Sequence, residues 1–324
     1  MAKTSFSFVL NADQQQRLKT LLEMGNYKPR QVPYTTIAVE AEDCMVNLYT
    51  SGKLLVQGKG AEDFVLFVLE PNVLMSATVG YEEVLNPESV APHMGSDESG
   101  KGDFFGPLVA CAVYVDPDLA HAMQELGVKD CKKLTDKAVF FIGKRTRELL
   151  GLKRYAIVSI GPEAYNRLYF KMRNVNTLLA WAHARCIENL LEGVPDCPRA
   201  VADQFGSEQL IKRALMKKGS KIKLEQHHKA ESDIAVAAAS VIARESFLRQ
   251  IQRIGEQHGI EVQKGASDQV RQTAIDLVKK EGPGVLVKTC KCHFRTTDLV
   301  LEACGATREQ LGEYGQATSR PTTK

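Results

Sequence analysis

Two adjacent acidic residues, Asp97 and Glu98, lie in the segment GSDESGKGDFFGP, which begins at Gly95. The first eight residues of this segment nearly match the phosphate-binding pattern G-x-x-x-x-G-K-[ST]. A nucleotide-binding loop of that kind has a hydroxyl after the lysine to coordinate Mg²⁺, and Gly102 stands there instead. The two carboxylates would also repel a phosphate held in the loop. The segment therefore favours a metal site over a nucleotide-binding loop.

Acidic residues occur at three places where an apolar segment ends: Asp97 with Glu98, Asp203, and Glu231 with Asp233. Buried carboxylates that lie close together raise each other's pKa, and they stay ionised only around cations. Mg²⁺ and Mn²⁺ prefer such oxygen ligands. Each acid taken singly is also explained as a helix cap or a surface residue, so at this point the sequence leaves both interpretations open.

The first group of elements that could position these acids spans residues 1–75 and reads as a small α+β module. Strands are predicted at SFSFVL and TTIAVEAE, a helix at DQQQRLKTLLEM, and a hairpin that turns at Ser51 and Gly52. A helix at AEDFVLFVL closes the module. Residues 76–94 lack clear periodicity and contain Gly80, Pro87 and Pro92, which is typical of a linker.

Residues 95–312 alternate strands and helices, a pattern that predicts a mixed α/β domain. Strands are expected across residues 95–115 and at RYAIVSI, RAVAD and KIKLEQ. Helices are expected over residues 136–150, in stretches up to Leu191, at SEQLIKRALMKK, and in the Ala-rich segment beginning near Ile234. The polar residues 313–324 are expected to form a frayed tail.

The composition is that of an ordinary globular protein. With 324 residues, 44% of them hydrophobic, the chain can bury a sizeable core in two domains. The formal charge of +3 is compatible with a polyanionic partner but does not demonstrate one. No apolar run approaches the roughly 18 residues of a membrane span, and the start lacks the apolar region of a secretory signal. Eight scattered cysteines favour reduced thiols, so we expect a cytoplasmic protein.

Metal-ligating residue types crowd together at Cys290, Cys292 and His293. Structural zinc is held by four ligands at recognisable spacings, and no second ligand pair follows this segment closely. The sequence therefore disfavours a zinc site there.

Four segments in order, GSDESGKGDFFGPL, GVKDCKKLTDK, ADQF and KAESDIAVAAASVIAR, resemble the successive motifs of bacterial ribonuclease HIII. The likeness spans about residues 95 to 300, and the amino-terminal module resembles the TBP-like substrate-binding domain of that family. The resemblance implies an RNase H-like fold and hydrolysis of the RNA strand of RNA–DNA hybrids, with Mg²⁺ or Mn²⁺ as cofactor. It also implies four catalytic and metal-binding acids, which fall on Asp97, Glu98, Asp203 and Glu231.

Chemistry with two divalent ions suits these acids. Two ions about 4 Å apart stabilise both the attacking and the leaving oxygen of an in-line displacement. The family's products have 5′-phosphate and 3′-hydroxyl ends. Glycines in the segment formed by Ser99, Gly100, Lys101 and Gly102 would let backbone groups approach the sugar edge, where the 2′-hydroxyl distinguishes RNA from DNA. The alternative role of this segment is a plain hairpin turn.

A second candidate substrate contact is the segment that contains Lys132 and Lys133. Cys131 departs from the family's usual D-S-K pattern, and a thiol is a poorer donor to phosphate than a hydroxyl. The two lysines still supply charge for a phosphate. Alternatively, the segment only leads into the next helix, with Thr135 as its N-cap. A basic run over residues 212–223 is equally consistent with phosphate contacts and with a solvated helix face.

Two other functions remain as alternatives. A non-catalytic nucleic-acid-binding protein could keep the fold, but the complete set of candidate acids stands against it. A ribonuclease HII that cleaves at single ribonucleotides in duplex DNA would leave the amino-terminal module unexplained. We expect a monomer whose partner is an RNA–DNA hybrid, with no membrane and no obligate protein partner.

Overall fold

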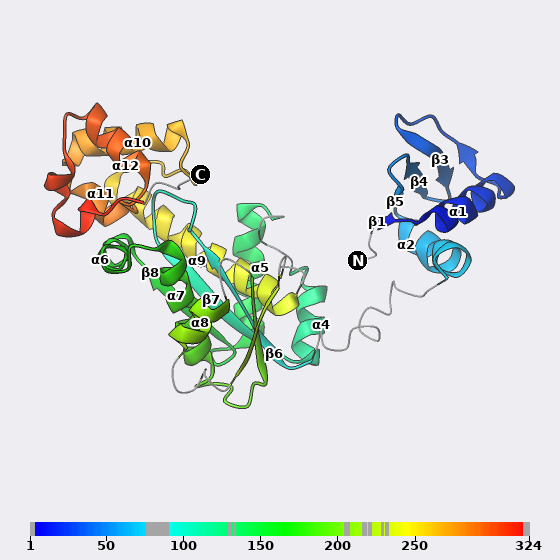
Figure 1. Ribbon diagram of the computed structural model, residues 1–324, viewed down its shortest axis with the longest axis horizontal. Helices are drawn as coiled ribbons and strands as arrows, with labels where there is room; N and C mark the ends of the chain where they lie inside the picture. Colours follow the sequence, from blue (N-terminus) through cyan, green and yellow to red (C-terminus); the bar gives the residue numbers. More distant parts are fainter. Residues whose placement is uncertain are drawn as a thin grey trace. The chain divides into compact units, whose positions relative to one another are not determined.

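The computed structural model describes residues 4–75, 91–128, 131, 134–203, 208–215, 219, 222–227, 230 and 233–319 (Figure 1). The chain divides into two compact units, Met1–Ser89 and Val90–Lys324. Most of the predicted linker, residues 76–90, lies outside the described residues. Each unit has its own sheet and its own apolar core.

The first unit is a five-stranded antiparallel sheet that packs against helices. Its strands are β1 (Ser5–Val9), β2 (Lys28–Pro29), β3 (Thr35–Ala41), β4 (Cys44–Tyr49) and β5 (Lys53–Gly58), in the spatial order β1-β5-β4-β3-β2. Its helices are α1 (Ala12–Met24), α2 (Ala61–Phe64) and the π-helix η1 (Val65–Leu74). The predicted hairpin is confirmed, and Gly52 takes a φ of +81° at its turn. The closing helix runs past its predicted end at Leu69 and continues as η1 to Leu74.

The second unit is built on a mixed five-stranded sheet with the order β10-β9-β6-β7-β8. Its strands are β6 (His93–Ser99), β7 (Leu108–Val115), β8 (Tyr155–Ile160), β9 (Arg199–Asp203) and β10 (Lys223–His227). β6, β7 and β8 are antiparallel, whereas β9 and β10 run parallel to β6. The first helices are α4 (Pro117–Glu125), α5 (Asp136–Leu150), α6 (Pro162–Met172), α7 (Val175–Leu190), α8 (Glu208–Ala214) and α9 (Ile234–His258).

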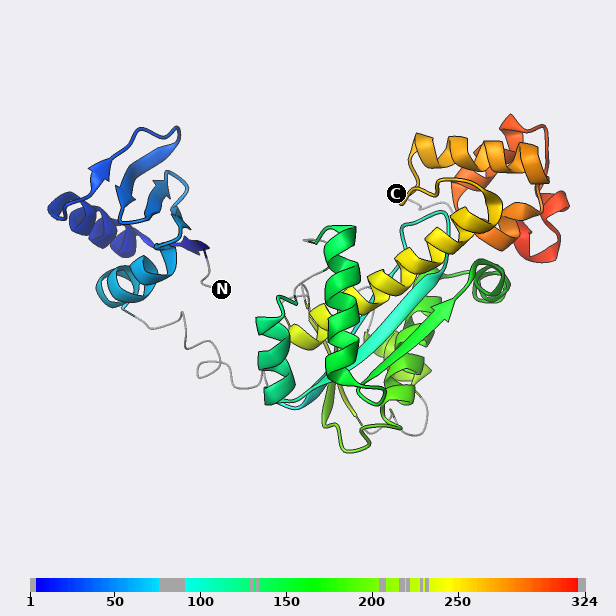
Figure 2. The same cartoon turned by 180° about the vertical axis from the view of Figure 1, so that it is seen from behind.

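Helices cover both faces of this sheet (Figures 1 and 2). Successive residues of a strand point to opposite faces. Accordingly, Ala110 and Ala112 of β7 belong to the core cluster that contains α7, whereas Cys111 and Val113 belong to the cluster that contains α9. The predicted strands and the predicted helices over residues 136–150 and near Ile234 are confirmed, so the sheet has a defined α7 face and a defined α9 face.

The carboxyl-terminal helices form a separate cluster at the far end of α9 (orange to red in Figures 1 and 2). They are α10 (Asp268–Glu281), α11 (Val285–Thr289), α12 (Arg295–Ala303) and the 3₁₀ helices η6 (Arg308–Leu311) and η7 (Glu313–Gln316). Phe104 and Phe105, from the connection between β6 and β7, are buried in this cluster. Neither these helices nor α4 was predicted from the sequence. Among the described residues, no helix has the length and apolarity needed to cross a membrane.

The prediction of a frayed tail is wrong for residues 313–317. These residues form η7 and its C-cap, and Ala317 is 2% exposed within the cluster that contains α7. Arg308 Nη1 donates to the carbonyl oxygen of Gly315 at 2.8 Å. The sequence did not predict an ordered segment here, because its composition is polar and shows no apolar pattern. The segment is held instead by an arginine that donates hydrogen bonds to backbone carbonyls.

Candidate active site

Asp97 and Glu98 lie near the carboxyl end of β6, the central strand of the sheet. Ser96 of β6 is in register with Ala202 of the parallel strand β9. Asp97 and Asp203 are the next residues of the two strands, and they therefore occupy the same level of the sheet. The fold brings three of the predicted acids to the carboxyl ends of two adjacent parallel strands.

Asp97 lies on the α9 face of β6, which that helix approaches closely. A Cβ on Gly95 would lie 2.2 Å from the backbone nitrogen of Val236, so any side chain there would push α9 away from the strand. Asp97 pairs across the sheet with Cys111, whose side chain belongs to the cluster on the same face. Asp97 Oδ1 also accepts a hydrogen bond from the Glu98 backbone nitrogen at 2.7 Å. The carboxylate of Asp97 is thus held close to the backbone of its own strand.

Glu98 lies on the opposite, α7 face, where a buried histidine contacts it. His183 of α7 is fully buried, and its Nε2 lies 3.1 Å from Glu98 Oε2. Its Nδ1 lies 3.0 Å from Ser96 Oγ. An imidazole that donates a hydrogen bond from Nε2 to the carboxylate can accept one from the Ser96 hydroxyl at Nδ1. The pair of contacts fixes one oxygen of Glu98, while the other, Oε1, lies 3.8 Å from Lys101 Nζ.

His183 is not singled out by the sequence pattern. The residue lies in the stretch LLAWAHARC, whose apolar residues dominate the pattern of α7. The sequence feature that marks this histidine is its position as a polar residue on the buried face of an amphipathic helix. That feature does not predict which residue the histidine contacts. Because Glu98 lies 85 positions away, the contact becomes evident only in the folded chain.

The predicted ribose-reading segment forms a tight turn directly after β6. Gly100 has a φ of +92°, and a Cβ there would lie 2.2 Å from the carbonyl oxygen of Pro107, so this position requires glycine. The Asp103 nitrogen donates to the Gly100 carbonyl oxygen at 3.4 Å and closes the turn. Lys101 and Gly102 are exposed, and a Cβ on Gly102 would meet open space. The backbone of the turn at residues 101 and 102 is therefore open to solvent.

The remaining predicted site residues are only partly described. Asp203 is described as the last residue of β9, while Glu231, Lys132 and Lys133 lie outside the described residues. Ala230, which precedes Glu231, is buried in a small cluster with Val201 of β9 and Val236 of α9. In the part of the chain that the structure describes, no three His, Cys, Asp or Glu side chains form a metal-binding group.

Asp233 has a structural role at the start of α9. Its Oδ1 accepts from the backbone nitrogens of Ala235 at 2.9 Å and Val236 at 3.1 Å, which confirms the prediction that Asp233 can act as N-cap. The buried His93, the first residue of β6, lies with its Nε2 2.9 Å from Asp233 Oδ2. Asp233 therefore connects the start of α9 to the start of β6.

The segment before α5 retains both of its interpretations. Thr135 Oγ1 accepts from the Ala138 nitrogen at 3.3 Å, so the expected N-cap is present. The half-buried Cys131 donates its backbone N–H to Ser240 Oγ of α9 at 3.1 Å. The phosphate contact predicted for Lys132 and Lys133 falls outside the described residues.

Cys290 and Cys292 are buried in the carboxyl-terminal cluster. Burial raises the pKa of Cys292 to about 12 and that of Cys290 well above its usual value, so both thiols stay neutral. Burial, with the nearby charges of Lys291 and Arg308, lowers the pKa of His293 to about 3. The His293 ring packs against the Tyr169 ring in a tilted arrangement, with the ring centres 4.4 Å apart. These residues pack as core side chains.

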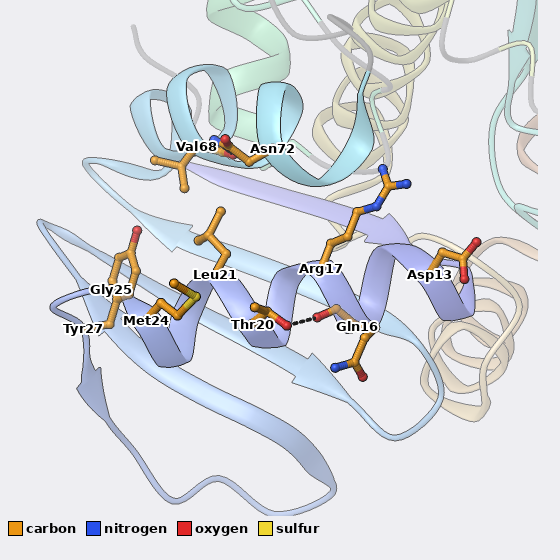
Figure 3. A pocket seen from close by; sticks show the side chains of 10 residues that line it. All are labelled: Asp13, Gln16, Arg17, Thr20, Leu21, Met24, Gly25, Tyr27, Val68 and Asn72. Carbon is orange, nitrogen blue, oxygen red and sulfur yellow. Dashed lines mark hydrogen bonds between the residues drawn. The ribbon is translucent and has the colours of Figure 1, made fainter.

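A surface groove lies in the first unit, between α1 and η1 (Figure 3). Arg17, Leu21 and Met24 of α1 line it opposite Val68 and Asn72 of η1. None of the predicted site residues lies in this groove.

Comparison with known proteins identifies the family. A family model described as Ribonuclease HII matches residues 94–297, and one described as a domain of unknown function (DUF3378) matches residues 7–72. Ribonuclease HIII of Protochlamydia amoebophila (strain UWE25) is 39% identical over 272 residues, which cover 84% of this chain and 88% of that protein. This chain belongs to the ribonuclease HIII family. Ribonuclease HIII of Chlamydia trachomatis serovar L2 is also 39% identical, over 88% of this chain and 93% of that protein.

Solved structures of ribonuclease HIII proteins share the fold. Bst-RNase HIII in complex with Mn²⁺ aligns with a TM-score of 0.64 and 27% identity, covering 92% of this chain and 98% of that chain. Aquifex aeolicus RNase H3 aligns with a TM-score of 0.52 and 28% identity, over 88% of this chain and 98% of that chain. The expected RNase H-like α/β fold with a small amino-terminal α+β domain is confirmed. The chain is a ribonuclease H, an endoribonuclease that acts on RNA–DNA hybrids.

Proposed function

We propose that this ribonuclease H hydrolyses the RNA strand of RNA–DNA hybrids through two divalent cations, Mg²⁺ or Mn²⁺, bound by Asp97, Glu98, Asp203 and Glu231. The observation that carries the proposal is the position of Asp97 and Glu98 beside Asp203, at the ends of two parallel strands. Bst-RNase HIII, which shares the fold, holds Mn²⁺.

The carboxylate set suits hard divalent cations. Acidic side chains that lie together at the end of a buried sheet repel one another unless cations compensate their charge. When bound, two such ions would stabilise the attacking and leaving oxygens of an in-line displacement. Attack by water with the 3′-oxygen as leaving group would give 5′-phosphate and 3′-hydroxyl ends. His183 would hold the Glu98 carboxylate in one orientation, since Glu98 Oε2 and His183 Nε2 lie 3.1 Å apart.

The chain itself orients the substrate. The backbone at residues 101 and 102 projects from the turn after β6, directly beside the acids, and would meet the sugar edge that carries the 2′-hydroxyl. Lys132 and Lys133 would contact a phosphate of the same strand. The first unit, residues 1–75, would act as a separate hybrid-binding domain, because its sheet and core are independent of the second unit.

A monomer in the cytoplasm is the proposed form of the enzyme. All eight cysteines are free thiols, which suits a reducing compartment. Sedimentation of the purified protein with and without hybrid tests the monomer.

Cleavage of defined substrates tests the function. The protein is incubated with Mg²⁺ or Mn²⁺ and either a labelled RNA–DNA hybrid or a DNA duplex that contains one ribonucleotide, beside the variant Asp97→Asn. We expect cleavage throughout the RNA strand of the hybrid and none by the variant, which should still bind the hybrid. Cleavage restricted to the single ribonucleotide would favour the ribonuclease HII alternative, and absence of any cleavage would favour the non-catalytic one. Near-normal cleavage by Asp97→Asn at saturating Mg²⁺ would refute the metal assignment.

A further inference from the structure

Lys291 is the one lysine that is fully buried among the described residues. Its Nζ donates to the carbonyl oxygens of Asp103 at 2.8 Å, Phe105 at 3.2 Å and Gly106 at 2.8 Å. A lysine ammonium has three protons, so each can be matched with one carbonyl. The side chain thereby joins the carboxyl-terminal cluster to loop 103–106, which connects the turn after β6 to β7.

Loop 103–106 and the turn that precedes it share a residue. The Asp103 nitrogen closes the turn on the Gly100 carbonyl, while the Asp103 carbonyl accepts from Lys291. The backbone nitrogen of Gly265 donates to Asp103 Oδ1 at 2.6 Å. A displacement of Asp103 would therefore move the end of the turn whose exposed backbone lies at residues 101 and 102.

Burying the charged side chain of Lys291 between loop 103–106 and the carboxyl-terminal cluster costs free energy. Burial lowers the pKa of Lys291 to about 7, and the neighbouring Asp103 carboxylate only partly opposes that effect. An apolar side chain of similar volume often stabilises a protein core as well as a buried ionic group does. Lys291 also lies 5.8 Å from the centre of the Tyr165 ring and 6.0 Å from that of Phe247, so apolar contacts were available to a different residue. What the lysine adds is a fixed arrangement of three carbonyls.

We propose that Lys291 is a positioning residue for the substrate: by holding the carbonyls of loop 103–106, it fixes the turn at residues 100–103 in the form that contacts the sugar edge of the hybrid. The inference rests on the proposed function, in which this turn contacts ribose. Lys291 itself touches neither the acids nor the turn's exposed face, so its effect concerns substrate binding rather than metal binding.

The test compares Lys291→Met and Lys291→Gln with the wild type in the full-length protein. The matched control is Lys288→Met, three residues away on α11 and exposed. For Lys291→Met we expect KM for the hybrid to rise about tenfold, which corresponds to about 1.4 kcal/mol, while kcat stays within about twofold. Lys291→Gln, which retains two N–H donors, should show a smaller rise. Mn²⁺ binding without substrate, followed by calorimetry, should be unchanged.

Each result decides the proposal. An unchanged KM in folded Lys291→Met would overturn it, and so would an equal fall in kcat and in Mn²⁺ affinity, which would place the effect at the metal site. Failure of both variants to fold would also overturn it, because the lysine would then serve the fold alone. A wild type that cleaves no hybrid would refute the proposed function instead, so the two failures are distinguishable.

Discussion

Replacing His183 with leucine should weaken metal binding, because the imidazole is the described contact that orients Glu98 on the α7 face. The two groups lie 3.1 Å apart, with His183 fully buried and the Glu98 side chain 13% exposed, so solvent screens their interaction little. A hydrogen bond to a charged group contributes about 1.5–3 kcal/mol, which corresponds to about 10–100-fold in a dissociation constant. Loss of a residue that orients a metal ligand typically has an effect of the same size.

Calorimetric titration of Mn²⁺ into the full-length protein without substrate measures this effect directly. His183→Leu should bind Mn²⁺ about 10–100-fold more weakly, whereas His183→Gln, which keeps an N–H donor near the position of Nε2, should lose less. The leucine also removes the partner of the buried Ser96 hydroxyl, which costs about 1–3 kcal/mol of folding stability. Unfolding temperatures must therefore accompany the titration.

The control is His258→Leu, which removes a different imidazole–carboxylate pair, that between His258 and Glu281. It should leave Mn²⁺ affinity unchanged. The reasoning is refuted if folded His183→Leu binds Mn²⁺ with wild-type affinity, or if His258→Leu weakens binding equally.

Three further outcomes are expected. Glu231→Gln should abolish cleavage, whereas Asp233→Asn should lower the unfolding free energy by about 1 kcal/mol, because the start of α9 loses a negative charge, and leave the rate nearly intact; a kinetic comparison that ranks them in reverse contradicts this assignment. Deleting residues 1–80 should raise KM for a long hybrid, change kcat much less and flatten the salt dependence of binding; unchanged affinity in a well-folded truncation rules out a hybrid-binding role for the first unit. The difference in unfolding free energy between the wild type and Lys291→Met should shift in favour of the wild type between about pH 7 and 10, because burial lowers the folded-state pKa of Lys291 from 10.5 to about 7, so in the wild type the lysine binds more protons in the unfolded state in that window; parallel pH curves would contradict it.

The sequence predicted the sheet of the second unit well because its strands are short apolar runs. β7 is buried along almost its whole length. Its sequence is an apolar run that ends at Asp116, and such a run predicts a buried strand. Asp97 and Glu98 were predicted as site residues for a related reason, since two acids that adjoin an apolar strand have no role in a core. The helices after His258 were missed because they bury their apolar residues in a cluster of their own, and no motif drew attention to them.

Contacts between distant residues could not be predicted in this way. Asn166, for example, donates from Nδ2 to the Cys290 carbonyl oxygen at 2.9 Å and accepts at Oδ1 from the Cys292 nitrogen at 2.9 Å, over 120 residues away. Side-chain type alone predicts that a buried amide will find partners, but not which backbone groups they are. The fold class thus follows from local patterns, whereas the orientation of site residues depends on the assembled chain.

The turn after β6 is supported from two sides by buried polar side chains of this kind. His183 holds Glu98 just before the turn, and Lys291 holds Asp103 at its end. Burying a polar group is costly unless its hydrogen bonds are made, and once they are made it allows few alternative positions. Gly100 adds a constraint of shape, because no other residue fits against the Pro107 carbonyl. Two hydrogen-bonded anchors and one steric requirement therefore restrict a short exposed backbone segment, which is the rigidity that the proposed contact with a sugar requires.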